Sequence, residues 1–374
     1  MQTEMAGVLV LADGTVVRGG GAGAAGVTVG ELVFQTGMVG YQETMSDPSY
    51  AGQLLMFTYP LVGNYGAGPA LQQSAAIQAR GVILRDLLPS GGHRDSTGDL
   101  ADLLAAHGVP VLTGVDTRFL TRRVREQGVI PGALAVGPAA ELPTPAELQA
   151  RAIAFDYAAE DFVTACATPV LVWQPSARPN GPRLALIDYG AKTSMVDHLR
   201  ARGAGVWLVP PHWSAAAVLA LQPDGILLSN GPGDPAHLAG PLDTVRGLLD
   251  HGTVPIFGIC LGHQLLARAA GGQTIKMPFG HRGVNQPVIE TATGRVAITT
   301  QNHGYVVDAT GLPADYRVTH SNLNDGSVEG IAHWGRPWWG VQWHPEAHPG
   351  PTDTQHLWDT FLAATSSARV AVSF

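Results

Sequence analysis

The chain has 374 residues, of which 45% are hydrophobic and 14% charged, so it can bury two cores and is not a disordered protein. Its formal net charge is −8 and its basic residues form no cluster, which excludes nucleic acids and anionic membranes as its main partners. Two cysteines, Cys166 and Cys260, are too few for a disulfide scaffold and favour a reducing compartment. The N-terminal segment lacks the basic start of a signal peptide, and no apolar run is long enough to span a bilayer. We therefore expect a soluble, cytoplasmic protein.

The first part of the chain, residues 1–137, is predicted to be a strand-rich α+β domain. Short apolar runs at 8–11, 54–58 and 81–84 alternate with Gly, Pro and Asp turn signals, and helices are expected near 97–106 and 118–127. Prolines recur over 138–182, which predicts a linker. Within that linker Thr144, Pro145 and Glu147 have the pattern of a capping box at the start of a helix.

A glycine-rich stretch at 21–26 matches the dinucleotide-binding pattern G-x-G-x-x-G. That pattern requires a helix after it, whereas residues 27–34 are predicted to form a strand, and no acidic residue stands convincingly at the expected distance. We interpret the stretch as a glycine-rich surface turn.

From residue 183 onward, strand and helix patterns alternate. Buried strands are predicted for RLALIDY, GVWLVP, DGILLS and VPIFGI, with helices near 195–202 and 242–251 and a terminal helix near 354–365. Such alternation is typical of α/β folds with a doubly wound, mostly parallel sheet, whose ligands bind at the carboxyl ends of the strands. Residues 183–374 are therefore predicted to form a second domain.

Cys260 lies in a pattern that predicts a nucleophile. A buried strand enters Gly258-Ile259-Cys260-Leu261-Gly262, and an apolar helical pattern follows. This is the nucleophile elbow with cysteine in place of serine, in which flanking glycines allow a tight, strained turn that exposes the sulfur at the rim of the sheet. The helix N-terminus favours negative charge there. Cys166 has no such context and is interpreted as an ordinary buried cysteine.

A base and the group that orients it are predicted at the end of another strand. In Gln342-Trp343-His344-Pro345-Glu346, His344 would end the strand and Glu346 would lie on the same side of an extended backbone, which Pro345 favours. His344, Glu346 and His348 could also be metal ligands, but their spacing differs from H-E-x-x-H, so no metal is expected. An ordinary surface histidine is the remaining alternative.

The loop Ser229-Asn230-Gly231-Pro232-Gly233-Asp234-Pro235 follows a predicted strand. Its glycines would let backbone N–H groups approach a ligand, as an oxyanion hole requires, although the same residues also suit an ordinary turn. The segment Asn302-His303-Gly304-Tyr305 carries a still weaker signal.

Three of these segments, SNGPGDP, GICLGHQ and QWHPEA, resemble the class I, triad-type glutamine amidotransferases over residues 183–370. GYQE at 40–43, DPSY at 47–50, TYP at 58–60, GVDTR at 114–118 and FGHRG at 279–283 resemble the small-subunit family of carbamoyl-phosphate synthetases. The resemblance thus spans nearly the whole chain.

The resemblance implies a role for residues that match the motifs of the family. Cys260 would be the nucleophile, His344 the general base and acid, and Glu346 the residue that orients His344. The N–H groups of Gly231 and Leu261 would form the oxyanion hole. The residues that would hold glutamine are Ser49, Gly231, Gly233, Gln264, Asn302, Gly304 and Tyr305. Ser49 belongs to the first domain, which implies a site near the domain boundary.

The resemblance further implies that the chain is the glutaminase subunit of a carbamoyl-phosphate synthetase serving arginine and pyrimidine biosynthesis. The chain contains no Gly-Lys-Ser/Thr phosphate loop, so ATP, magnesium and bicarbonate are expected on a large partner subunit, and no cofactor on this chain. The alternatives are a component of another class I amidotransferase, serving anthranilate, aminodeoxychorismate or GMP synthesis, and a free-standing thiol hydrolase. A catalytically inactive scaffold is disfavoured because the triad is intact.

Overall fold

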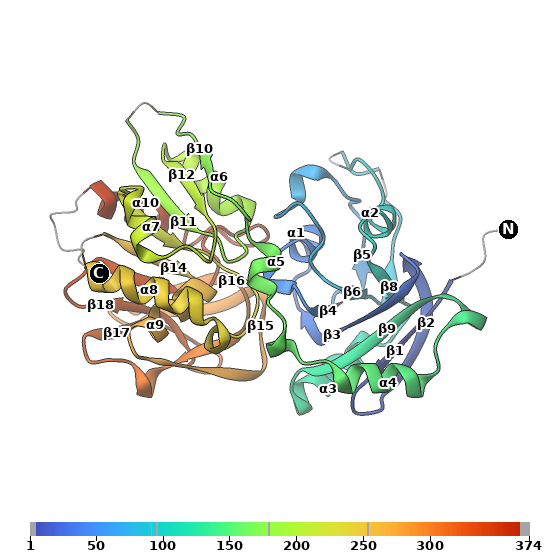
Figure 1. Cartoon of the computed structure of the whole chain (residues 1–374). Coiled ribbons are helices and arrows are strands. Elements are labelled where there is room, and N and C mark those ends of the chain that lie inside the picture. The colour runs from blue at the N-terminus through green and yellow to red at the C-terminus, as the bar shows by residue number, and fades with distance from the viewer. Residues whose placement is uncertain (1–4, 91, 95, 179, 253, 367–374) are drawn as a thin grey trace. The chain divides into compact units, whose positions relative to one another are not determined.

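The computed structural model describes residues 5–366 except 91, 95, 179 and 253 (Figure 1). The chain divides into two compact units, Met1–Glu160 and Asp161–Phe374. The boundary falls inside the stretch 138–182 that was predicted to be a linker, in which residue 179 lies outside the described part. The beginning of this stretch is not a linker, because α4 (Pro145–Ala154) packs on strands of the first unit through Leu148 and Ala152.

The first unit is built on a closed barrel with the strand order β1-β2-β8-β6-β4-β3-β9. These strands are β1 Met5–Leu11, β2 Val16–Gly23, β3 Gly26–Gln35, β4 Gln53–Phe57, β6 Gly81–Ile83, β8 Pro110–Thr113 and β9 Ile130–Pro138, and a separate small sheet pairs β5 Leu61–Val62 with β7 Asp86–Leu87. Strands β3, β4, β6 and β8 run parallel in that order, and the other pairs of the barrel are antiparallel. The prediction of a strand-rich first domain is confirmed.

Four α-helices and four short 3-10 helices of the described chain complete this unit. They are α1 Tyr41–Met45, η1 Pro48–Tyr50, η2 Pro69–Leu71, α2 Leu100–Ala106, α3 Thr117–Gln127, η3 Ala139–Glu141, α4 and η4 Tyr157–Ala159. The Thr144–Glu147 capping box is present as predicted. Helix α2 begins three residues later than predicted, because Asp99 occupies its N-cap in extended geometry.

The glycine-rich stretch at 21–26 is not simply a surface turn. Gly21 and Gly23 belong to β2, and β3 begins at Gly26, so the predicted strand after the stretch is confirmed. A Cβ atom at Gly21 would lie 2.7 Å from the Ala6 carbonyl oxygen of β1. The glycine therefore allows close packing of neighbouring strands.

The second unit is built on one ten-stranded sheet, in the order β10-β12-β11-β13-β14-β19-β18-β16-β15-β17. Its strands are β10 Val172–Gln174, β11 Arg183–Ile187, β12 Gly205–Val209, β13 Gly225–Leu228, β14 Ile256–Ile259, β15 Gln273–Glu290, β16 Val296–Asp308, β17 Tyr316–Asn322, β18 Val328–His333 and β19 Trp338–Val341. Strands β12, β11, β13, β14 and β19 are parallel, and the remaining pairs are antiparallel. The predicted α/β class with a doubly wound sheet is confirmed.

Helices cover both faces of the parallel strands (Figure 1). They are α5 Phe162–Cys166, α6 Thr193–Ala201, α7 Ala215–Ala220, η5 Pro235–His237, α8 Ala239–His251, α9 Leu261–Ala269, η6 Ala309–Gly311 and α10 His356–Ser366. One core joins α7, α8 and α9 to the sheet, and the other joins α6 and α10 to its opposite face. Ala185 faces the first core and Leu184 the second, as alternation along a buried strand requires. No helix of the described chain is long and apolar enough to cross a membrane.

Candidate active site

Cys260 stands between β14 and α9, where the chain turns sharply from strand to helix. Its backbone has φ 52° and ψ −105°, a conformation that costs a non-glycine residue about 1–3 kcal/mol and is held only by its surroundings. The Cys260 N–H donates to the Val341 carbonyl at 2.9 Å, which ties the turn to β19. The predicted elbow is confirmed, but Cys260 is only 3% exposed, so the sulfur is more enclosed than the sequence pattern suggested.

The two glycines of the elbow are needed for close packing. A Cβ atom at Gly258 would lie 2.6 Å from the Gly262 carbonyl oxygen, and one at Gly262 would lie 2.1 Å from the Leu228 carbonyl oxygen. Both distances are too short for any side chain. The Gly262 N–H also donates to the Ser229 carbonyl at 3.0 Å, which draws α9 against the end of β13.

Replacing Gly262 with alanine is expected to destabilise the second unit by roughly 3 kcal/mol or more, because the new methyl group would overlap backbone that cannot move without displacing β13. Thermal unfolding followed by circular dichroism measures the effect. Gly240→Ala is the matched control, since no atom lies within 4 Å of the Cβ position at Gly240. Equal stability of the two variants would show that the elbow tolerates a side chain.

His344 lies in the loop after β19. This strand ends at Val341, three residues earlier than predicted, and Glu346 lies in a turn and not on an extended backbone. The His344 N–H donates to the Thr300 carbonyl at 2.9 Å, which fixes the loop beside β16. The Glu346 carboxylate still reaches the imidazole, with 2.6 Å between Glu346 Oε1 and His344 Nδ1. This bond leaves Nε2 as the ring nitrogen available to the thiol.

The charges of this group are strongly coupled. Burial lowers the pKa of His344, but the Glu346 carboxylate outweighs burial and, with a contribution from Cys260, raises that pKa to about 10. Burial raises the pKa of Glu346, but Lys192 and His344 outweigh it and lower the pKa to about 2. At neutral pH the site therefore holds a carboxylate and an imidazolium, and the imidazolium is positioned to stabilise a thiolate at Cys260.

The predicted oxyanion donors lie together at the carboxyl end of the parallel strands. A Cβ atom at Gly231 would lie 2.2 Å from the Tyr189 carbonyl oxygen and 3.0 Å from Leu261 Cδ2, so the loop after β13 touches the start of α9. Within the described part of the chain, the N–H groups of Gly231 and Leu261 donate no hydrogen bond. Both are therefore open to an acceptor from outside the protein, and Gly233 provides the positive φ of 99° that turns the loop.

Other residues that are predicted to bind the substrate lie on strand β16, which passes close to Cys260. The Cys260 Sγ–H donates to the Asn302 carbonyl at 3.7 Å. The Gln264 side chain, on α9, donates to the Tyr305 carbonyl at 2.7 Å. Gly304 lies between these contacts on β16. The structure thus places Asn302 beside the Cys260 sulfur and joins Gln264 of the following helix to Tyr305.

Ser49 belongs to the first unit, where it lies in η1. Asp47 caps this turn by accepting from the Ser49 N–H at 2.9 Å. Ser49 is 6% exposed. Its contact with glutamine stays a prediction.

Comparison with known proteins finds a matching family for each of the two units. Residues 9–134 match the family described as carbamoyl-phosphate synthase small chain, CPSase domain, and residues 185–364 match glutamine amidotransferase class-I. The carbamoyl phosphate synthase small chain of Symbiobacterium thermophilum is 47% identical over 96% of this chain and 98% of its own length. The chain belongs to the carbamoyl-phosphate synthase small chain family.

Other relatives agree with this assignment. The small chain of Listeria monocytogenes is 44% identical over 95% of both chains. The pyrimidine-specific small chain of Halalkalibacterium halodurans is 44% identical over 96% of this chain and 97% of its own length. This member of the family is therefore a glutamine amidotransferase, and the predictions of enzyme class and family are confirmed.

Lys192 also belongs to this site, although it is not among the predicted residues. Its side chain is 2% exposed, its Nζ lies 3.2 Å from Glu346 Oε1, and it also donates to the Ala347 carbonyl. Two sequence signals could have found it: it is one of only two lysines, and it follows β11 at the carboxyl end of the sheet. Lys192 holds the Glu346 carboxylate ionised and in place.

Replacing Lys192 with methionine is expected to cost about 3–5 kcal/mol of unfolding free energy, because a buried carboxylate loses its cation. Glutaminase kcat should fall as well, since Glu346 is then free to move away from His344. Urea unfolding and steady-state ammonia release measure the two effects. Lys276→Met, which removes the other lysine from an exposed position, should leave stability nearly unchanged. Similar losses in both variants would contradict the role given to Lys192.

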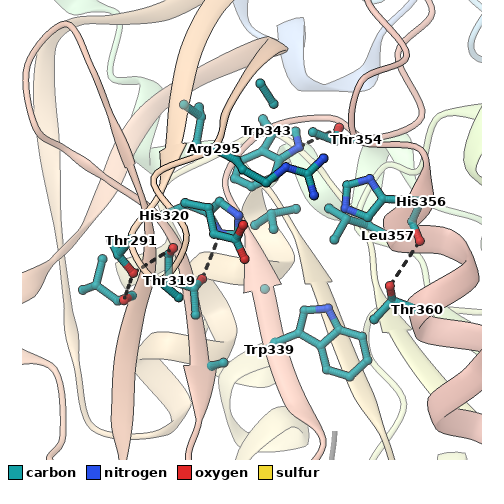
Figure 2. A pocket seen from close by; sticks show the side chains of 18 of the residues that line it. Thr291, Arg295, Thr319, His320, Trp339, Trp343, Thr354, His356, Leu357 and Thr360 are labelled. Atoms are coloured by element: carbon teal, nitrogen blue, oxygen red, sulfur yellow. Dashed lines mark hydrogen bonds between the residues drawn. The ribbon is translucent and has the colours of Figure 1, made fainter. Parts of the chain in front are cut away.

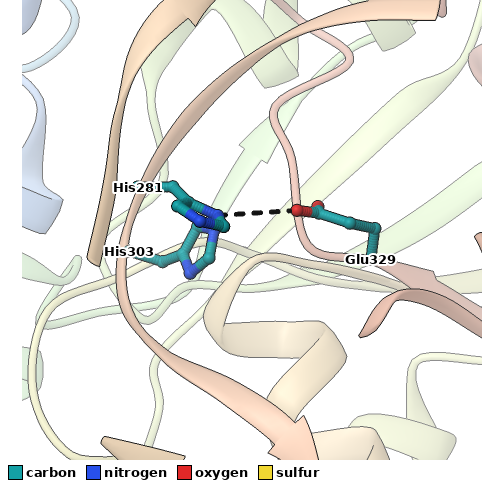
Figure 3. A group of neighbouring side chains, drawn as sticks. All are labelled: His281, His303 and Glu329. Atoms are coloured by element: carbon teal, nitrogen blue, oxygen red, sulfur yellow. Dashed lines mark ion pairs between the residues drawn. The ribbon is translucent and has the colours of Figure 1, made fainter. Parts of the chain in front are cut away.

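A second buried cluster joins His281 of β15, His303 of β16 and Glu329 of β18 (Figure 3). His281 Nε2 pairs with Asp325 Oδ2 at 2.9 Å and its Nδ1 faces Glu329 Oε1 at 3.7 Å. The His303 ring nitrogens bond the Tyr305 carbonyl at 3.0 Å and Gln301 Oε1 at 3.1 Å.

Protein groups thus engage every ring nitrogen of both histidines. Burial lowers the pKa of His281, but Glu329 and Asp325 outweigh it and raise that pKa, which favours an internal ion pair. We interpret the cluster as an internal support that joins β15, β16 and β18, and not as a metal site.

Proposed function

We propose that this small chain hydrolyses glutamine through a thioester on Cys260. The observation that carries this proposal is the side-chain hydrogen bond between Cys260, on its strained elbow, and the buried His344 that Glu346 holds. In this mechanism the Cys260 thiolate attacks the side-chain carboxamide carbon of glutamine. The negative charge that develops on the carboxamide oxygen is held by the N–H groups of Gly231 and Leu261, each contributing roughly 2.7–4 kcal/mol.

Proton transfer in this mechanism depends on His344. The imidazolium protonates the amine as the carbon–nitrogen bond breaks, which releases ammonia and leaves a glutamyl thioester. The neutral imidazole then accepts a proton from water, whose oxygen attacks the thioester to give glutamate and the free thiol. Glu346 keeps the ring oriented in both steps, and Lys192 keeps Glu346 ionised. Gln264, Asn302, Gly304, Tyr305, Gly233 and Ser49 are proposed to hold the substrate.

We also propose a partner for the released ammonia. Free ammonia at neutral pH is mostly protonated and not nucleophilic, so it is useful only when it passes directly to a second active site. The relatives are named small chains, which supports a large synthetase subunit as the acceptor. That subunit would bind ATP, magnesium and bicarbonate and form carbamoyl phosphate for arginine and pyrimidine biosynthesis in the cytoplasm.

Reconstitution with the candidate large subunit tests this function. The mixture should form carbamoyl phosphate from glutamine, ATP and bicarbonate, whereas this chain alone should show only weak glutaminase activity. With the Cys260→Ala chain, the mixture should lose synthesis from glutamine but keep synthesis from added ammonium salt. Rapid glutamine hydrolysis by the isolated chain, with no gain when the large subunit is added, would instead favour a free-standing hydrolase.

A further inference from the structure

A cavity of about 820 Å³ opens in the second unit, and none of Cys260, His344 and Glu346 lines it (Figure 2). Strands β17, β18 and β19 form one wall, the start of α10 forms another, and the turn between β15 and β16 closes a third. The volume falls in the range of sites for small molecules, about 300–1,000 Å³. No assigned function accounts for this cavity.

The floor of the cavity is apolar and continuous with the hydrophobic core. Val288, Ala332, Trp339 and Leu357 line it and also belong to the core that joins α6 and α10 to the sheet. Trp339 packs on Phe361 of α10 with ring centroids 5.9 Å apart. Because the core fixes these side chains, the floor is formed before any ligand arrives.

Aromatic rings with fixed orientation form the sides. The Trp343 indole N–H donates to Thr354 Oγ1 at 3.0 Å, and its ring meets His320 edge-on with centroids 4.9 Å apart. Trp334, which is 63% exposed, stands at the rim, and the Arg317 guanidinium lies 4.2 Å from its ring centroid. Such a set of flat surfaces fits a planar ring better than a flexible aliphatic chain.

Charges of both signs line the cavity, the carboxylates of Glu290 and Asp353 and the guanidinium groups of Arg295 and Arg317. Glu290 accepts from the Thr293 hydroxyl at 2.5 Å and Asp353 accepts from the Ile298 N–H at 3.1 Å, so hydrogen bonds hold both carboxylates in place. The Arg295 side chain, by contrast, has no hydrogen bond or ion pair within the described residues. Its guanidinium points across the cavity (Figure 2). Burial lowers the pKa of His320 to about 4, so His320 is neutral and leaves Arg295 as the group that would meet an anion.

We propose that this cavity binds a planar aromatic molecule carrying one carboxylate or phosphate group, with the ring over the apolar floor beside Trp334 and the anion on Arg295. The Arg295 guanidinium suits a carboxylate or phosphate, because its N–H groups can donate to two anionic oxygens at once. The proposal is independent of glutamine hydrolysis and goes beyond the proposed function.

Isothermal titration of the full-length Cys260→Ala chain with 2-naphthoate and with 2-naphthamide tests the proposal. The two probes have the same ring and differ mainly in charge. The carboxylate should bind with a Kd on the order of 0.1–1 mM, and the neutral amide at least about fivefold more weakly. The Cys260→Ala substitution removes glutamine turnover, so failure here would not bear on the amidotransferase mechanism.

Arg295→Gln identifies the site. It should remove the preference for 2-naphthoate, and Arg295→Lys should restore part of it, whereas Arg246→Gln on the exposed face of α8 should change nothing. Arg295 is exposed, so these variants should fold normally. Equal binding of the two probes, binding of 2-naphthoate that Arg295→Gln leaves unchanged, or no binding of either probe would each overturn the proposal.

Discussion

Replacing Cys260 with alanine is expected to lower the glutaminase activity of this small chain roughly 10⁵-fold or more, to the level of background hydrolysis. The physical reason is that the reaction divides one difficult displacement into two easier ones by way of a covalent intermediate, and no other described side chain at the elbow can form it. Ammonia release from glutamine, followed with a coupled glutamate assay, measures the loss.

Cys166→Ala is the matched control for this loss. Cys166 ends α5 in a half-buried position and has no part in the proposed chemistry. The Cys166→Ala variant should keep the full glutaminase activity, and alkylation of its Cys260 thiol should abolish that activity as in the wild type. If the Cys260→Ala chain kept more than a trace of activity, or if Cys166→Ala lost it, the nucleophile would be wrongly assigned.

Replacing Glu346 with glutamine is expected to lower kcat by roughly 10³- to 10⁴-fold. The amide has nearly the same shape but no charge, so the main influence that raises the pKa of His344 to about 10 is lost, while burial continues to lower that pKa. The imidazolium then exists only at lower pH. The alkaline limb of the kcat profile should move down by several pH units.

The same change alters how stability depends on pH. In the wild type, His344 has a raised pKa, so its contribution to stability is complete below about 6.5 and is lost as the pH rises through about 10. Glu346 has a lowered pKa, so its contribution is present above about 4.5 and is lost as the pH falls through about 2. Both dependences should be absent in Glu346→Gln, which urea unfolding across this pH range measures. An unchanged alkaline limb in both activity and stability would contradict the coupling of His344 to Glu346.

The parts of the site that the sequence predicted are those fixed by local geometry. A Cys between two glycines at the end of a buried strand has few structural solutions, because only glycine permits the backbone contacts seen at Gly258 and Gly262. The capping box at Thr144 is local in the same sense. The alternation of strands and helices after residue 183 also predicted the doubly wound sheet. Buried strands that alternate with amphipathic helices can cover their apolar faces in few other arrangements.

The parts that the sequence could not predict depend on contacts between distant segments. Lys192 meets Glu346 across 154 positions of the chain, and the local sequence, although it could single out Lys192, does not predict which residue it pairs with. Proline at 345 suggested an extended chain after His344, but the segment turns there, and the carboxylate reaches the imidazole all the same. The same holds for the cavity beside Trp339 and Trp343, whose walls come from β15, β17, β18, β19 and α10.

The most direct test of the proposed chemistry is mass spectrometry of the small chain quenched in acid during glutamine turnover. A glutamyl adduct, labile to hydroxylamine as a thioester must be, is expected on the peptide that contains Cys260. The peptide that contains Cys166 should carry none. An adduct on another residue, or steady turnover with no adduct on Cys260 even in a rapid-quench experiment, would contradict catalysis through a thioester at this cysteine.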